Sequence, residues 1–315
     1  MLKNLFYPLP TCGAIRLGHI AADASGRNLP VKDDFFSVTY NYKSNGGWVL
    51  HKMHEKLMQE QKLDVQKDKL RTIPIKVIFN DIDFVMREGY EAFDRKTGRT
   101  LCRGNGEKCR RIDPASGKIE SYDCPSPTYC EFGQEARCKP FARANFQIDG
   151  QDDALSTFIL RTTSYNSVRT LRAKLTMIKA LCGGLAGVPL VLRLVARTAT
   201  QSYNQPFYFT DVQLAKSIEE SRKAHEEFCK NNSVDELETA LRPLFENGSF
   251  EDTVEEADDI KEFMSDDAGA EIVVPKGIAD ESAPPPSSDL DDLSALVKQR
   301  AESALPQSQP VVILN

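Results

Sequence analysis

The chain has 315 residues and a net charge of −6, and this length suits one large domain or two small ones. The charge is divided unevenly: residues 231–315 hold 20 acidic and 5 basic residues, whereas the rest of the chain holds 26 acidic and 35 basic residues. The longest apolar run, 185–195, is interrupted by Pro189 and Arg193. It falls far short of the roughly 20 residues that span a bilayer, so no membrane segment is expected.

A basic body with an acidic tail is typical of proteins that meet nucleic acid, where the tail competes for the same surface or recruits a partner. A solvated body with a solubilising tail is the plainer alternative. The N-terminal residues lack the apolar segment and cleavage site of a secretory signal. We therefore expect a cytoplasmic protein whose thiols stay reduced.

The first part of the body combines predicted strands with one helix. Alternating residues predict a short strand at 15–20, and aromatic and β-branched residues predict strands at 35–42 and 73–79. Residues 48–67 are polar with an apolar stripe at helical spacing, which predicts a helix.

Two sets of side chains in this part can carry chemistry. Asp81, Asp83 and Glu88 follow the third predicted strand, where carboxylates can bind Mg2+ or serve as acid and base in a metal-dependent hydrolase such as a nuclease. Turn-forming side chains explain them equally well. Tyr40 and Tyr42 can stack on the bases of single-stranded DNA, and packing within the strand is the alternative.

Five of the eight cysteines lie within residues 102–138, among residues that favour turns. Such a segment buries little apolar surface, so disulfides or a metal ion must hold it together. Reduced thiols favour a structural zinc ion bound by four thiolates, although the segment contains no CxxC motif, in which two residues separate a pair of cysteines. A loop of unliganded thiols is the alternative.

An odd number of cysteines leaves one without a place in such a zinc site. The predicted zinc ligands are Cys102, Cys124, Cys130 and Cys138. Cys109 lies among basic residues that would lower its pKa, which makes it an alternative ligand or a reactive thiol.

The remaining body is predicted to contain a β-hairpin at 141–161, a helix at 166–182, two strands at 190–198 and 206–214, and a helix at 215–230. The helix at 166–182 has an apolar stripe and a basic face that can contact the phosphate backbone of DNA. A helix packed on the sheet with a solvated charged face is the alternative. The basic residues are Arg169, Arg172, Lys174 and Lys179.

The last part of the chain differs in composition from the body. Residues 235–310 are acidic and then rich in Ala, Pro and Ser, which predicts disorder because too little apolar surface is available for a core. The apolar tip at 311–314 can dock a partner protein, and a non-functional end is the alternative.

Several motifs across the body stand in an order and spacing that carry a resemblance to a known family. The matching residues are Gly13 to Gly18, Pro30, 33–36, 73–79, Cys102 to Gly106, the three cysteines Cys124, Cys130 and Cys138, 162–167, and 187–189. Taken together, they resemble the recombination directionality factor-like family of serine-integrase phages and related mobile elements, and the resemblance covers roughly residues 11–215.

The resemblance implies an accessory protein that binds a large serine integrase at its coiled-coil region and switches it from integration to excision in a bacterial host cell. Relatives without such an integrase are often described as hydrolases or metal-binding proteins, and some stand beside single-strand annealing recombinases. A recombinase or serine integrase is therefore the expected partner, and DNA is a further candidate. The alternatives are a metal-dependent hydrolase and a single-stranded DNA-binding protein.

The expected architecture is an α+β body at 1–230 with a mixed sheet. A zinc module is inserted in it at about 95–141, and a disordered acidic tail follows at 231–315.

Overall fold

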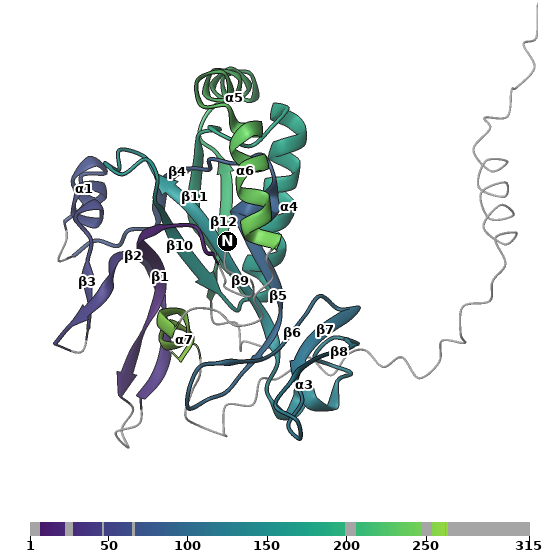
Figure 1. The fold of residues 1–315 in the computed structure, drawn as a ribbon. Helices are drawn as coiled ribbons and strands as arrows, with labels where there is room; N and C mark the ends of the chain where they lie inside the picture. The colour runs from purple at the N-terminus through teal and green to yellow at the C-terminus, as the bar shows by residue number, and fades with distance from the viewer. Residues whose placement is uncertain are drawn as a thin grey trace, which may run out of the picture. The chain divides into compact units, whose positions relative to one another are not determined.

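Twelve strands in the described part of the chain form a mixed sheet, and seven helices pack around it (Figure 1). The structure is a computed structural model that describes residues 7–22, 28–45, 47–64, 67–198, 206–246, 254–261 and 263. The strands are β1 (Thr11–Ala22), β2 (Asn28–Ser44), β3 (Gly47–Leu50), β4 (Thr72–Lys76), β5 (Met86–Phe93), β6 (Thr100–Gly104), β7 (Lys108–Ile112), β8 (Ile119–Asp123), β9 (Lys139–Ile148), β10 (Thr157–Thr162), β11 (Leu190–Arg197) and β12 (Phe207–Leu214). The helices are α1 (Lys52–Glu60), α2 (Ile82–Val85), α3 (Glu131–Glu135), α4 (Tyr165–Cys182), α5 (Ile218–Asn232), α6 (Val234–Glu246) and α7 (Val254–Lys261).

The sheet runs in the order β3-β2-β1-β10-β9-β5-β6-β7-β8, and β4 connects β9 to the pair β11 and β12. Strands β1 and β10 pair in parallel, whereas the neighbouring pairs β1–β2 and β9–β10 are antiparallel. The predicted α+β class with a mixed sheet is therefore confirmed. No helix of the described residues is both long and apolar enough to cross a membrane.

The main core fills the space between this sheet and the helices α1 and α4. It contains Phe36 and Phe146 from the sheet and Leu57 and Leu171 from the helices, all of them fully buried. Helix α4 starts at the capping residue Ser164 and ends at Gly183, whose φ of 81° is left-handed.

The predicted helix at 48–67 is wrong at both ends, because α1 spans only Lys52–Glu60. Residues 47–50 form β3, in which Trp48 pairs with Lys43 of β2, and α1 begins only after His51 caps its N-terminus. The prediction of turns alone at 102–138 is also wrong, because this segment folds into β6, β7, β8 and α3.

The structure describes helices within the first part of the predicted tail at 231–315, at Val234–Glu246 and Val254–Lys261. Helix α5 continues to Asn232, and both α6 and α7 belong to the same unit as the sheet. Phe245 of α6 packs edge-on against Phe84 at 4.6 Å between ring centroids. Average composition hid α6, because its few apolar residues gather on one face. The later part of the predicted tail, including the tip at 311–314, lies outside the described residues.

Two histidines hold α1 against β2 as neutral rings. The Nδ1 atom of His51 accepts a hydrogen bond from the Met53 amide at 3.0 Å, and the Nδ1 atom of His54 accepts one from the Val38 amide at 3.4 Å. Burial lowers the pKa of both rings below the ordinary value of 6.5.

Acidification is expected to destabilise the body through these rings. As the pH falls below 6.5, the unfolded chain takes up protons that the folded chain does not. The free energy of unfolding should therefore fall between about pH 7 and about pH 5, and it should fall less in His54→Gln. Urea denaturation across this range measures both changes, and an equal fall in the two proteins would contradict the role given to His54.

Candidate functional site

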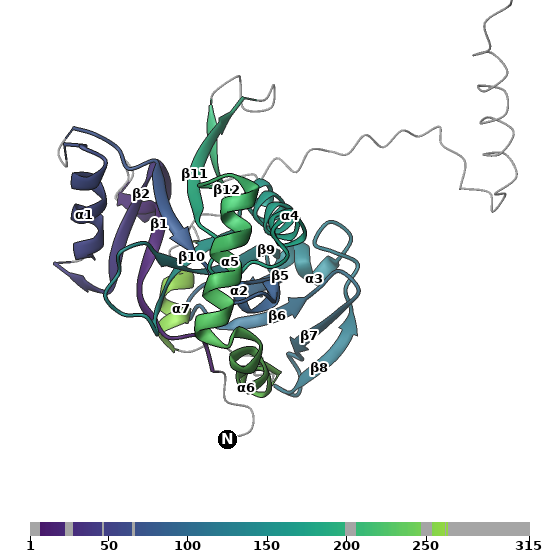
Figure 2. The same ribbon diagram turned by 90° about the horizontal axis from the view of Figure 1, so that it is seen from above.

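Five thiols gather where a short meander leaves the main sheet. The chain passes from β5 through β6, β7, β8 and α3 before it returns in β9, which pairs with β5 (Figures 1 and 2). Cys102 lies on β6, Cys109 lies on β7, and Cys124 follows β8. Cys130 caps the N-terminus of α3, and Cys138 precedes β9. We call these five residues the thiol cluster.

The thiol cluster forms a small core of its own. Cys102, Cys109 and Cys124 are 7%, 6% and 8% exposed, and Cys138 packs against them. Burial, and then the neighbouring Cys109 thiol, raise the pKa of Cys102 well above its usual range. Burial, and then Cys124 and Cys130, raise the pKa of Cys138 to about 12. At neutral pH these two thiols stay uncharged unless a cation balances their ionised form.

The chemistry of these donors suits zinc, which binds thiolates in closed four-coordinate sites. All eight cysteines are free of disulfides. Among the described residues, however, no three His, Cys, Asp or Glu side chains are arranged so that they could hold a metal ion. The structure therefore brings the predicted ligands Cys102, Cys124, Cys130 and Cys138 together without arranging them as a zinc site. Which of the five thiols would be spare stays a prediction.

Close backbone approach to the thiols depends on glycine. A Cβ atom on Gly104 would lie 2.7 Å from both the Cβ of Cys109 and the Sγ of Cys124. Replacing Gly104 by Ala should therefore displace the cluster and lower the free energy of unfolding by about 1–3 kcal/mol. Gly47→Ala is the matched control, because its added Cβ meets no atom closer than 4.0 Å. Thermal unfolding measures both variants, and equal stability would contradict the tight packing.

The three carboxylates of the predicted hydrolase site are each paired with an arginine. Asp81 caps α2 and lies 3.0 Å from Arg242, which confirms the turn-forming alternative for this residue. Arg172 contacts Asp83 at 2.7 Å and Glu88 at 3.3 Å. Within the described residues, these carboxylates belong to no group of three His, Cys, Asp or Glu side chains that could hold a metal ion.

The predicted DNA-contacting residues of α4 do not form one exposed basic face. The Nζ atom of Lys174 lies 2.6 Å from Asp211 of β12, and Arg172 is paired with carboxylates as described above. Arg169 and Lys179 are exposed. The positive charges of Arg172 and Lys174, two of the four predicted DNA contacts, are therefore already paired with carboxylates of the protein itself.

The two tyrosines proposed to stack on bases stack on each other instead, with ring centroids 5.3 Å apart. Tyr40 also packs on His51 at 4.2 Å, which agrees with the packing alternative. Tyr42 is 56% exposed.

Sequence reasoning missed a row of arginines on the sheet face opposite the main core. Arg143 of β9 stands directly opposite Arg161 of β10 and Arg87 of β5 in the strand register. Arg16 of β1 extends the row to a fourth adjacent strand. We call these four residues the arginine row. Glu91, which is 1% exposed, binds the guanidinium of Arg143 at 2.9 and 3.1 Å.

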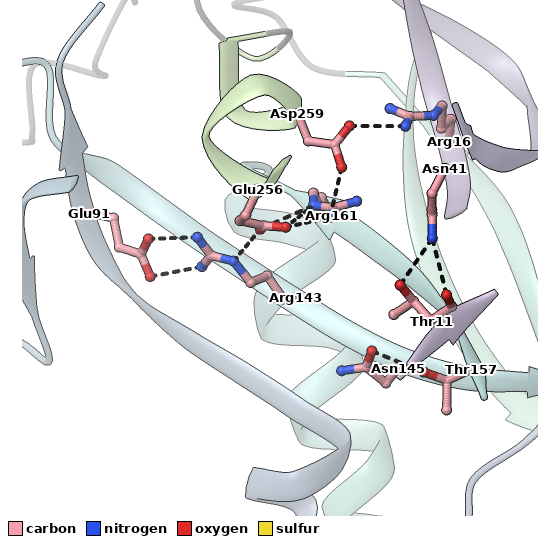
Figure 3. Close-up of polar contacts among 10 residues, drawn as sticks. All are labelled: Thr11, Arg16, Asn41, Glu91, Arg143, Asn145, Thr157, Arg161, Glu256 and Asp259. Carbon is pink, nitrogen blue, oxygen red and sulfur yellow. Dashed lines mark hydrogen bonds and ion pairs between the residues drawn. The ribbon is translucent and has the colours of Figure 1, made fainter. Parts of the chain in front are cut away.

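Helix α7 supplies two further carboxylates that contact the arginine row (Figure 3). Glu256 lies 2.6 Å from the Nε atom of Arg143 and also accepts hydrogen bonds from Arg161. Asp259 contacts Arg161 at 2.8 Å and Arg16 at 3.2 Å. The first half of the predicted disordered tail thus places two acidic side chains, three residues apart, on three arginines of the body.

A comparison with models of protein families matches residues 12–215 to the family described as Gp3-like, recombination directionality factor-like. Searches of curated proteins and of solved structures found no match. The matched residues span more than half of the chain and include the main sheet, the thiol cluster and the arginine row. The chain therefore belongs to the Gp3-like, recombination directionality factor-like family.

Proposed function

We propose that the chain is an accessory protein in the DNA recombination of a phage or mobile element, and that it acts by binding a recombinase in the cytoplasm of the host. A serine integrase is the partner that we expect. The family match over residues 12–215 carries this proposal. The body of the protein offers a broad sheet that continues into a thiol-rich meander with its own small core, and both suit a binding platform.

The thiol cluster would serve this platform as a structural zinc site. The meander has strands of only five residues and a core made largely of cysteine side chains, which supply little apolar surface. Four of the five thiols, with Cys102, Cys124, Cys130 and Cys138 as the predicted set, would hold the ion. A bound zinc ion would cross-link the segments and stabilise them in place of a larger apolar core.

Binding of a purified serine integrase from the same element tests the proposed function. Sedimentation velocity of the full chain mixed with the integrase should give a stoichiometric complex. An integrase from an unrelated element is the control, and it should sediment separately. Separate sedimentation of the matched pair, with both proteins folded, would contradict recombinase binding.

A further inference from the structure

The arginine row is an unfavourable arrangement for a protein with nothing bound to it. Arg87, Arg143 and Arg161 occupy directly opposed positions on neighbouring strands, where like charges destabilise a sheet. Arg143 and Arg161 are also buried, with side chains only 2% and 9% exposed. Buried charges of one sign require carboxylates to neutralise them. The body itself contributes Glu91, and Glu256 and Asp259 of α7 are the carboxylates that bind Arg161 among the residues that the structure describes.

Helix α7 fits the row because the two spacings agree. Side chains three residues apart on a helix lie about 5–6 Å from each other, and neighbouring strands lie about 4.8 Å apart. Glu256 therefore reaches Arg143 and Arg161, and Asp259 reaches Arg161 and Arg16. A second helix with acidic residues at this spacing would present its carboxylates at the same separation as α7 does.

Apolar contacts fix the direction in which such a helix lies. Ile260 is 1% exposed and packs with Phe93 of β5 and with Phe141, which lies two residues from Arg143 on β9. The ring of Phe263 lies edge-on to Phe141 at 5.5 Å between centroids, and Lys139 donates a hydrogen bond to the Phe263 carbonyl oxygen at 2.7 Å. A helix that binds like α7 therefore needs two acidic residues three positions apart, like Glu256 and Asp259. It also needs apolar residues one and four positions after the second acidic residue, like Ile260 and Phe263.

The eight residues of α7 leave part of this surface open. A cleft of about 340 Å³ is lined by Arg16, Arg161 and Phe263. A second cleft, of about 720 Å³, is lined by Arg87, Arg143 and Arg161 together with residues of α7. We call the arginine row with these two clefts the arginine groove. The two clefts extend this surface beyond the side chains that α7 contacts.

We propose that the arginine groove is a docking site for an acidic amphipathic helix of a partner protein, and that α7 occupies this site in cis until the partner helix replaces it. The pocket formed by Phe93 and Phe141 favours a helix over nucleic acid, because a phosphate backbone has no apolar side chains to bury there. A helix as short as α7 has little stability of its own, so it can leave the groove at moderate cost. This surface is independent of the proposed recombinase partner, since a peptide can serve as the ligand.

A labelled peptide with the sequence of residues 252–264 tests the exchange. The receptor is the full chain with Glu256→Ala, Asp259→Ala and Ile260→Ala, which we call the undocked variant. Because α7 competes in cis, the undocked variant should bind the peptide at least about tenfold more tightly than the wild-type chain. Fluorescence anisotropy measures both affinities, and equal affinities would overturn the proposal. Trp48, whose ring centroid lies 3.4 Å from the Arg16 guanidinium carbon, gives a second signal without a label.

Matched controls separate the groove from general charge attraction. Adding Arg161→Ala to the undocked variant should weaken peptide binding at least about tenfold, whereas adding Arg169→Ala on the exposed surface of α4 should change it less than about twofold. A peptide with Gln and Asn in place of Glu256 and Asp259 should bind at least about tenfold more weakly than the acidic peptide. Equal effects of the two arginine substitutions would overturn the proposal.

Two further outcomes are decisive. An oligonucleotide of equal charge should not displace the peptide, and displacement at the same concentration would show a nucleic-acid surface instead of a helix site. If the undocked variant does not fold, amide hydrogen exchange of the wild-type chain tests whether α7 leaves the groove. Hydrogen exchange at the α7 amides at least about tenfold faster than at the amides of β9 and β10 would support the release of α7 from the groove. Equal protection of α7 and these strands would overturn the proposal.

Discussion

Purified without added metal, the wild-type chain is expected to carry about one zinc ion, and Cys124→Ser is expected to carry none. Cys124 is 8% exposed within the thiol cluster, and its thiolate would be one of four ligands. Loss of the ion should lower the free energy of unfolding by at least about 3 kcal/mol, because binding of a structural zinc ion contributes directly to folding. Elemental analysis and urea denaturation measure the two effects.

Cys229→Ser is the matched control for this prediction. Cys229 is a half-buried free thiol on α5, outside the thiol cluster, so its variant should keep the metal and most of the stability. Treatment of the wild-type chain with a chelator should reproduce the loss seen in Cys124→Ser. A wild-type chain that takes up no zinc even after incubation with the metal would contradict the zinc proposal and leave the cluster as a core of uncharged thiols.

Replacing Glu91 by Ala is expected to lower the free energy of unfolding by about 3–5 kcal/mol, because the substitution breaks a buried ion pair. Glu91 is 1% exposed and accepts hydrogen bonds from Arg143 at 2.9 and 3.1 Å and from Arg103 at 3.4 Å. Without this carboxylate, the positive charges of Arg143 and its cross-strand neighbours are less well neutralised. Urea denaturation followed by circular dichroism measures the loss.

Two variants show whether charge or packing causes this loss. Glu91→Gln keeps the shape of the side chain, and it should still be destabilised by at least about 1 kcal/mol because the buried arginines lose a charge partner. Glu60→Ala, at the exposed end of α1, should change stability by less than about 0.5 kcal/mol. A loss in Glu91→Ala no greater than that in Glu60→Ala would contradict the buried charge network.

Periodicity in the sequence predicted the regular elements of the body well. The stripe that includes Leu171 and Leu175 predicted a helix at 166–182, and the structure places α4 at Tyr165–Cys182. The prediction for 48–67 was wrong at its start because Trp48 fits a strand as well as a helix, and only pairing with Lys43 decides between them. The meander of β6, β7 and β8 was missed because turn residues separate strands of only five residues.

The arginine row could not be predicted because it depends on strand register. Arg143 and Arg161 each follow the alternation of their strands, but nothing local shows that they stand opposite each other. The role of α7 is also non-local, since Glu256 lies 113 residues from Arg143 in sequence. By contrast, the thiol cluster was visible as a concentration of cysteines, and the structure adds that all five thiols gather at one meander.

Recombination by the serine integrase of the same element, with and without the chain, tests the proposed function most directly. The substrates are the two sites of an integrated element, and the readout is the yield of excised product. The proposed function predicts that excision occurs only when the chain is present. It also predicts that the chain slows integration in the parallel reaction. An unchanged yield in both directions, with a folded chain at concentrations above that of the integrase, would contradict the proposed function.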